Sequence, residues 1–163
     1  MIRKTREEDL DAVMKIVQDA QAFLHAHNVP QWINGYPSRD DFHHDMERGS
    51  SFVLEENGSV LGVACISMDH EDTYDVINGA WLDDDPYVVI HRIAIARECK
   101  GKHLAHQFVA YAEHLGRSSI RIDTHEKNTS MRAFLEKEGF AYCGIIHLHD
   151  GAPRYAYEKQ IRK

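Results

Sequence analysis

The sequence predicts an α/β fold, a single domain over residues 1–163 in which helices flank a mixed, mostly antiparallel twisted sheet. Two hairpin signals, Asn57-Gly58 and Asp150-Gly151, each stand between apolar runs that favour strands. Between these hairpins, strand-like runs alternate with segments of helical period, an order that favours local parallel pairing. No repeat, low-complexity segment or linker divides the chain, whose length suits one domain.

The first half of the chain predicts a short strand, two helices and a hairpin. Thr5 and Glu8 have the spacing of a capping box, and apolar residues then recur at helical spacing as far as His27. Proline and glycine interrupt the next segment, after which Ser38 followed by Asp41 predicts a second, short helix. The strands of the hairpin are predicted at 52–54 and 60–66.

The second half predicts four more strands and two helices. A strand over 87–95 leads through a short basic turn into a helix that Gly116 can end. The next strand, 120–122, is expected to pair in parallel with 87–95. A helix around Phe134 then closes at Gly139, and the C-terminal hairpin is predicted from strands at 140–149 and 154–160.

Composition excludes several classes of function. The net charge of −7 argues against nonspecific nucleic-acid binding, which needs clustered Lys and Arg. No apolar run approaches the ~18 residues needed to span a membrane, and the N-terminus has no apolar signal core. The three cysteines are scattered without a CxxC spacing, so we expect a reduced, cytoplasmic protein with no nucleic-acid or membrane partner.

The twelve histidines raise the question of a metal site. Several are close in sequence, but no pair has a third ligand at a recognised spacing such as HExxH. A histidine-rich metal-binding protein is therefore the weakest alternative, and we predict no metal. The close pairs are His25 and His27, His43 and His44, His103 and His106, and His147 and His149.

The most informative segment is the turn between strand 87–95 and the helix after it. Free N–H groups at a helix start, the positive end of the helix dipole and two lysines together suit a pyrophosphate. Gly101 and Ala105 are small enough for the backbone to approach a ligand closely. The segment is not a Walker loop, because His103 follows Lys102, and GxGxxG is absent. On spacing alone, an ordinary strand-to-helix turn with solvated lysines is the favoured interpretation.

Taken with the order of elements, these residues resemble the GCN5-related N-acetyltransferase (GNAT) family over nearly the whole chain. The turn signature of that family, (Gln/Arg)-x-x-Gly-x-(Gly/Ala), is degenerate here. Lys100 and His103 replace two of its positions, and only Ala105 conforms. The resemblance implies the GNAT fold. The other residues that carry it are Ile2-Arg3-Lys4-Thr5 with Asp9, the strand segment His91–Ile95, Asn128, and the helix ending Phe134-Leu135-Glu136-Lys137-Glu138-Gly139-Phe140.

The resemblance implies acetyl-CoA (coenzyme A) as the cofactor. It places the pyrophosphate on backbone N–H groups of the turn and pairs the strand with the pantetheine arm, near which Asn128 would lie. A bulge common in this strand of the family frees an N–H near Ile93 that polarises the thioester carbonyl, a donor worth roughly 3–4 kcal/mol. The implied cofactor-binding residues are Ile93, Ala94, Ile95, Lys100, Gly101, Lys102, His103, Leu104, Ala105 and Asn128.

One departure concerns the proton that the leaving thiolate takes up. Many members carry Leu-Tyr near the end of the penultimate helix, where the Tyr is the acid. This chain has Phe134-Leu135 instead. Either another tyrosine takes over or the thiolate leaves unassisted, and the candidates are Tyr142, Tyr155 and Tyr157.

Two histidines are candidate general bases. A primary amine of pKa near 10.4 is almost entirely charged at neutral pH, which costs direct attack roughly 4 kcal/mol, and a base of pKa near 7 recovers part of that. His91 lies on strand 87–95, at an offset where arylalkylamine members of the family carry a proton-relaying His. A strand histidine bonded to a neighbouring carbonyl explains it equally well. His125 is the second candidate, with Asp123 either orienting it or capping the turn.

Aromatic residues on loops are the candidates for acceptor binding. Trp32 and Tyr36 follow the first helix, and Trp81 precedes the acidic run 83–85. The resemblance places the acceptor pocket against these regions, and the acidic run would attract a cationic amine. Packing of the aromatics and a solvated acidic turn are the simpler alternatives.

We therefore predict an acetyl-CoA-dependent N-acetyltransferase that acetylates a primary amine of a small molecule or peptide by direct attack. The alternative from another class is an acyl-CoA-binding regulator or sensor with little or no turnover, which His103 and Leu135 motivate. Homodimers are common in the family, so a homodimeric partner is also expected from the resemblance.

Overall fold

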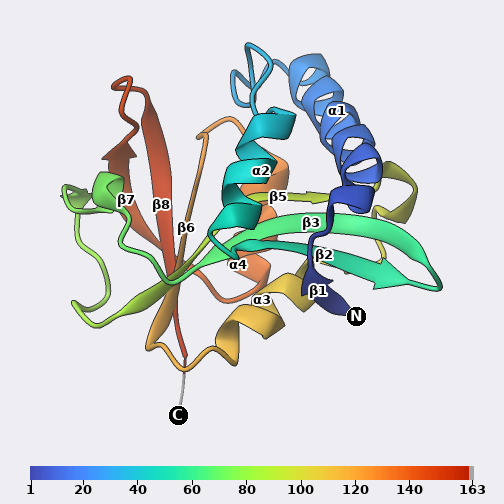
Figure 1. Cartoon of the computed structure of the whole chain (residues 1–163). Coiled ribbons are helices and arrows are strands. Elements are labelled where there is room, and N and C mark those ends of the chain that lie inside the picture. The colour runs from blue at the N-terminus through green and yellow to red at the C-terminus, as the bar shows by residue number, and fades with distance from the viewer. Residues whose placement is uncertain (162–163) are drawn as a thin grey trace. The chain divides into compact units, whose positions relative to one another are not determined.

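The structure is a computed structural model that describes residues 1–161 (Figure 1). The helices are α1 (Leu10–Ala26), α2 (Arg39–Glu47), α3 (Ala105–Glu113) and α4 (Thr129–Lys137). The strands are β1 (Ile2–Lys4), β2 (Ser51–Glu56), β3 (Ser59–Ser67), β4 (Asn78–Gly79), β5 (Tyr87–Ile95), β6 (Ser119–Thr124), β7 (Ala141–His147) and β8 (Pro153–Gln160).

The strands form a mixed sheet in the order β1-β2-β3-β5-β6-β8-β7-β4. β5 and β6 are parallel, with Tyr87 opposite Ser119. The pairs β1/β2, β2/β3, β6/β8, β7/β8 and β4/β7 are antiparallel. The predicted α/β fold with a mixed, mostly antiparallel sheet is confirmed, and so is the parallel pair. The chain divides into two compact units: the first is Met1–Ile66 with His91–Tyr111, and the second is Ser67–Ile90 with Ala112–Lys163.

In the first unit, α1 and α2 cover one face of β1–β3, and α3 lies on the opposite face (Figure 1). The alternation of side chains along β2 explains both contacts. Val53 is fully buried in one core with Val13 of α1 and Phe42 of α2. Its neighbour Phe52 points the other way and meets the ring of Tyr111 at 5.1 Å. The hairpin prediction is confirmed, since residues 57 and 58 join β2 to β3 with the positive φ values of a type I′ turn.

The two predicted helix starts have different outcomes. Ser38 and Asp41 form the expected capping box, in which the Ser38 N–H donates to Asp41 Oδ2 at 2.7 Å. The box predicted for Thr5 and Glu8 is wrong. The Thr5 hydroxyl instead bonds Ser51 Oγ across to β2 at 2.7 Å, and Asp9 accepts the free N–H at this helix start. A 3-10 turn, Glu7–Asp9, therefore precedes α1.

In the second unit, β6, β8 and β7 lie side by side, and the C-terminal hairpin forms as predicted (Figure 1). The sequence did not predict β4, a two-residue strand in which Gly79 pairs with Gly144 of β7. The pairing depends on a close backbone approach, because a Cβ on either glycine would collide with the backbone of the other strand. Two residues without a side-chain pattern carry no strand signal.

Candidate active site

Three bulky residues adopt a backbone conformation that such residues rarely take. Within residues 1–161, six residues other than glycine have positive φ, and three of them are asparagines, which tolerate it. The other three are Trp32 (φ 57°), Arg92 (φ 49°) and His103 (φ 58°). Backbone strain of this kind clusters at functional sites. Trp32 and His103 were already predicted site residues, and Arg92 lies between His91 and Ile93.

Arg92 interrupts β5 at its middle. A left-handed residue is found in one type of β-bulge, where a strand is locally disrupted and bends. His91 and Arg92 are both half-buried, and the residues on either side of them, Ile90 and Ile93, are buried. An unbroken strand would place His91 on one face with Val89 and Ile93, and the left-handed Arg92 interrupts that alternation.

The Arg92 side chain is held by two other segments of the first unit. Its Nε and Nη2 donate to the two carboxylate oxygens of Asp45 on α2, at 2.7 and 2.6 Å. Its Nη1 donates to the Tyr36 hydroxyl at 2.9 Å. Tyr36 exposes 41% of its surface, but its hydroxyl is largely buried. Burial raises the pKa of the phenol by more than the nearby charge of Arg92 lowers it. The structure thus brings a predicted acceptor residue to the broken strand. Asp45 and Arg92 were not predicted from the sequence, although an Arg inside an apolar strand was a signal.

The predicted pyrophosphate turn has the backbone that such a ligand needs. A 3-10 turn, Arg97–Cys99, leads from β5 to Gly101 (φ 83°) and His103 (φ 58°), and α3 begins at Ala105. Within residues 1–161, the N–H groups of Gly101 and His103 donate to no other group. A Cβ at Gly101 would meet no protein atom within 4 Å, so the space above this backbone is open. Open amides at a helix start fit the phosphate groups of a coenzyme A molecule.

The side chain of Lys100, which stands at the first position of the signature, turns toward α1. Its Nζ lies 3.3 Å from the centroid of the Phe23 ring. This cation–π contact holds the ammonium group beside the turn in the first unit. The positive charge therefore adds to the field of the turn while the backbone amides remain open.

In the second unit, His125 and Asn128 lie together at the start of α4. The N–H of Asn128 donates to the His125 carbonyl at 3.0 Å, and its side chain caps α4 by accepting the Met131 N–H at 3.1 Å. His125 Nδ1 accepts the Lys127 N–H at 3.0 Å. Burial, followed by the charge of Arg154, lowers the pKa of His125.

Two other residues of the second unit that we expected near the site, Asp123 and Trp81, make structural contacts instead. Asp123, considered as a partner for His125, accepts a hydrogen bond from the Tyr74 hydroxyl at 2.6 Å. Trp81 donates from Nε1 to the Tyr74 carbonyl at 2.9 Å, and its ring lies 4.2 Å from the Arg121 guanidinium carbon. These contacts match the packing alternative for Trp81. In the acidic run, the Asp83 carbonyl accepts from Arg121 Nη2 at 2.8 Å.

The candidate acids for the leaving thiolate form an aromatic cluster. The Tyr142 ring lies 5.0 Å from that of Tyr155 and 5.7 Å from that of Tyr157. Arg132 of α4 donates from Nε to the Tyr157 hydroxyl at 3.2 Å. Leu135, at the position where many family members carry the acid, is fully buried and has no proton to give.

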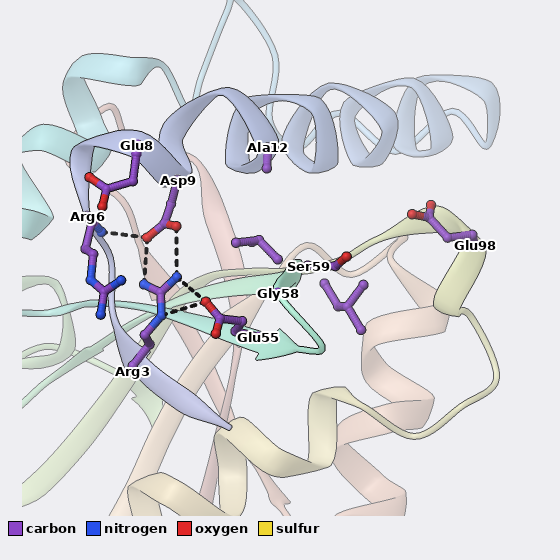
Figure 2. Close-up of a pocket in the computed structure, with 11 residues that line it drawn as sticks. Arg3, Arg6, Glu8, Asp9, Ala12, Glu55, Gly58, Ser59 and Glu98 are labelled. Atoms are coloured by element: carbon purple, nitrogen blue, oxygen red, sulfur yellow. Dashed lines mark hydrogen bonds and ion pairs between the residues drawn. The ribbon is translucent and has the colours of Figure 1, made fainter.

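A hollow of about 630 Å³ lies elsewhere in the first unit and is lined by none of the predicted site residues (Figure 2). Among its lining residues, Arg3 is paired with Asp9 and Glu55, at 2.7 and 2.6 Å. Among residues 1–161, no three metal-ligating side chains gather into a metal site. No helix in the described part of the chain has the length and apolarity to cross a membrane.

Comparison with known proteins identifies the family. The model of the acetyltransferase (GNAT) family matches residues 15–140. A GNAT-family acetyltransferase from Streptococcus agalactiae 2603 is 36% identical, with a TM-score of 0.92 over 100% of this chain and 96% of that one. A GNAT-family acetyltransferase from Listeria monocytogenes 4b F2365 is 23% identical, with a TM-score of 0.72 over 98% and 94%. The ribosomal-protein-S18-alanine N-acetyltransferase from Escherichia coli is 18% identical, with a TM-score of 0.62 over 100% and 94%. These last two show the likeness of fold alone. No curated protein matches the sequence.

The comparisons define an acyl-transferring enzyme, in which β5 contains a left-handed Arg92 and a turn with open amides precedes α3. The chain belongs to the GNAT acetyltransferase family. This match confirms the family resemblance predicted from the sequence. Membership of the family implies acyl transfer from acetyl-CoA.

Proposed function

We propose that this enzyme transfers the acetyl group of acetyl-CoA to a primary amine of a small molecule or peptide by direct attack. The observation that carries the proposal is the left-handed Arg92 in the middle of β5, directly before Ile93. A left-handed residue disturbs the hydrogen-bond ladder of a strand, and we propose that the Ile93 N–H beside it is thereby open to a ligand. That N–H is a preorganised donor for the charge that develops on a thioester oxygen.

The turn before α3 is the proposed anchor of the coenzyme. The open amides of Gly101 and His103 would hold the pyrophosphate, together with the first turn of α3, whose residues begin at Ala105. Residues 93–95 of β5 would pair their backbone with the pantetheine arm, and coenzyme binding by Asn128 stays a prediction from the resemblance. When bound, acetyl-CoA supplies the thioester carbon that the amine attacks. The turn contacts are backbone contacts, so the altered side chains in the signature do not remove them.

His91 is the better candidate for the general base. A base must offer a lone pair, and His125 Nδ1 already accepts the Lys127 N–H. The neutral His125 ring therefore carries its proton on Nε2. Its one lone pair, on Nδ1, is engaged by the Lys127 N–H and is not available to a substrate amine. His91 lies one residue before the break in β5 and is half-buried. We propose that it takes the proton from the attacking amine, while Tyr142, Tyr155 and Tyr157 stay candidate acids beside unassisted departure of the thiolate.

The test is thiol release from acetyl-CoA with a panel of amines and amino-terminal peptides, with products identified by mass. Turnover with at least one amine, together with loss of the acidic limb of the pH-rate profile in His91→Ala, supports the proposal. His125→Ala is the matched control and should keep that limb. Tight coenzyme binding without thiol release from any amine would favour the regulator, and absence of coenzyme binding would overturn both. The single domain over 1–163, the homodimer and the cytoplasmic location stay predictions.

A further inference from the structure

We infer that Asp45 is a positioning residue for acyl transfer, which acts through Arg92 to fix the backbone that presents the Ile93 N–H. The inference rests on the proposed function, because it assigns that N–H to the thioester oxygen. It also makes a structural claim that does not depend on catalysis: Asp45 fixes the backbone conformation of β5 at Arg92. Asp45 lies on α2, and the strand it controls is β5, 47 residues further along the chain.

Asp45 and Arg92 form a buried, bidentate ion pair. Both carboxylate oxygens are engaged, at 2.6 and 2.7 Å, by the adjacent Nη2 and Nε of one guanidinium. The side chains expose only 7% and 18% of their surface. The planar fork of Arg fixes direction as well as distance. Tyr36 adds a third contact from the loop after α1, so the guanidinium is held from two sides.

The backbone of Arg92 needs such an anchor. At φ 49° the Cβ of a residue other than glycine crowds its own backbone, and in an ordinary strand the residue would relax to the extended conformation. Relaxation would straighten β5 and turn the following N–H back into the ladder. It would also pull the guanidinium away from Asp45 and leave a buried carboxylate unpaired, which is strongly unfavourable. The ion pair therefore opposes the relaxation.

The same unit offers a matched ion pair that has no link to β5. Arg3 donates to both oxygens of Asp9, at 2.7 and 2.9 Å, and the two side chains expose 13% and 6% (Figure 2). If the Asp45–Arg92 pair only stabilised the fold, loss of either pair would have the same consequences. If Asp45 positions the Ile93 N–H, only its loss would change the chemical step.

The experiment compares Asp45→Asn with Asp9→Asn by thermal unfolding and by steady-state kinetics with the amine found in the panel. Both variants should unfold at lower temperature. Asp45→Asn should lower kcat by about 10- to 100-fold, part of the effect of removing an oxyanion donor, with KM for acetyl-CoA within about twofold. Asp9→Asn should leave kcat within about twofold of the parent. Equal kcat losses in the two variants would overturn the inference.

Two double variants separate backbone position from charge. In Asp45→Asn/Arg92→Gly the glycine adopts positive φ without an anchor, so kcat should recover by about tenfold over Asp45→Asn. In Asp45→Asn/Arg92→Ala the buried charge is removed as well, but alanine still resists positive φ, so kcat should stay low. Equal activities of the two double variants would refute the positioning role.

A readout that does not need turnover keeps this inference separate from the proposed function. Selective ¹⁵N-isoleucine labelling allows the Ile93 amide signal to be followed by NMR in each variant. It should shift in Asp45→Asn, stay in place in Asp9→Asn, and return toward the parent position in the double variant with glycine but not in that with alanine. If no amine is acetylated but these shifts occur, the proposed function fails and the positioning stands. An Ile93 signal that does not move in Asp45→Asn overturns the positioning.

Discussion

Replacement of Gly101 by alanine should weaken coenzyme A binding far more than it weakens the fold. Gly101 has φ 83°, and a Cβ added there meets no protein atom within 4 Å. The folded protein therefore pays only the backbone cost of a left-handed alanine, ~1–2 kcal/mol, partly offset by the lower entropy of the unfolded chain. We expect a net loss of about 1 kcal/mol, which corresponds to a fall of roughly 2–4 °C in Tm for a chain of this size.

The effect on the ligand is larger, because the open space above Gly101 is where the phosphate groups would approach the amide. A methyl group there lengthens or removes a hydrogen bond to a charged group, which is worth ~1.5–3 kcal/mol. The Kd for coenzyme A, measured by isothermal titration calorimetry, should rise by roughly 10- to 100-fold.

Gly116 supplies a matched control. It also has φ 83° and open space where a Cβ would stand, but it lies beyond the end of α3 and outside the turn. Gly116→Ala should lose about the same stability as Gly101→Ala by the same backbone argument and leave the Kd for coenzyme A within about twofold. Equal changes of Kd in the two variants would refute the pyrophosphate turn. Lys102→Ala should have only a small effect, since the proposed contacts are made by the backbone.

Three further predictions concern stability in the second unit. Glu158→Gln leaves a buried guanidinium without its carboxylate and should cost about 3–5 kcal/mol in urea unfolding, whereas Glu113→Gln breaks a part-exposed pair and should cost at most ~1 kcal/mol. Gly144→Ala sets a Cβ against a carbonyl of β4 and should cost about 2–3 kcal/mol, more than Gly151→Ala, whose Cβ meets open space; equal losses would contradict the close approach. Burial lowers the pKa of His125 below its ordinary 6.5, so the unfolded chain takes up this proton first and stability is lost as pH falls below about 6.5. His125→Gln should make that loss smaller, and an unchanged pH dependence would contradict the prediction.

The parts of the fold that could be predicted are those with a local signal. Strand 87–95 was predicted to the residue because an apolar run is bounded by turn residues on both sides. Both hairpins were predicted from an Asx-Gly pair: Asn57 and Gly58 both adopt positive φ in a tight turn, whereas in the longer C-terminal turn only Gly151 does. β4 could not be predicted, because two residues hold their place only through the backbone of β7. The capping box at Thr5 was wrong since Ser51, 46 residues away, offered the hydroxyl a better partner.

In the candidate site too, features with a local signal could be predicted and contacts between distant segments could not. The turn 100–105 follows from local spacing and resemblance, but the anchor of Arg92 does not, because Asp45 becomes its partner only when α2 packs on the sheet. Trp81 looked like an acceptor residue because it stands on a loop beside an acidic run. Its partner Arg121 lies on β6, 40 residues away. The guanidinium of Arg121 packs against the rings of both Trp81 and Tyr87. Pairings between distant segments leave no periodic trace in a single sequence.

The conformation of His103 changes the meaning of the degenerate signature. The family has glycine at this position, and the replacement suggested a turn that had lost its function. In the structure His103 has φ 58°, the region in which glycine is favoured for lack of a Cβ. Histidine is among the side chains that occupy this region more often than most, so the turn keeps its shape at a modest cost. The signature thus records a backbone conformation rather than a side-chain chemistry. Strained backbone at His103 and at Arg92 in β5 is typical of functional sites, and both lie beside the backbone N–H groups that we propose as donors, which favours an active enzyme over a silent regulator.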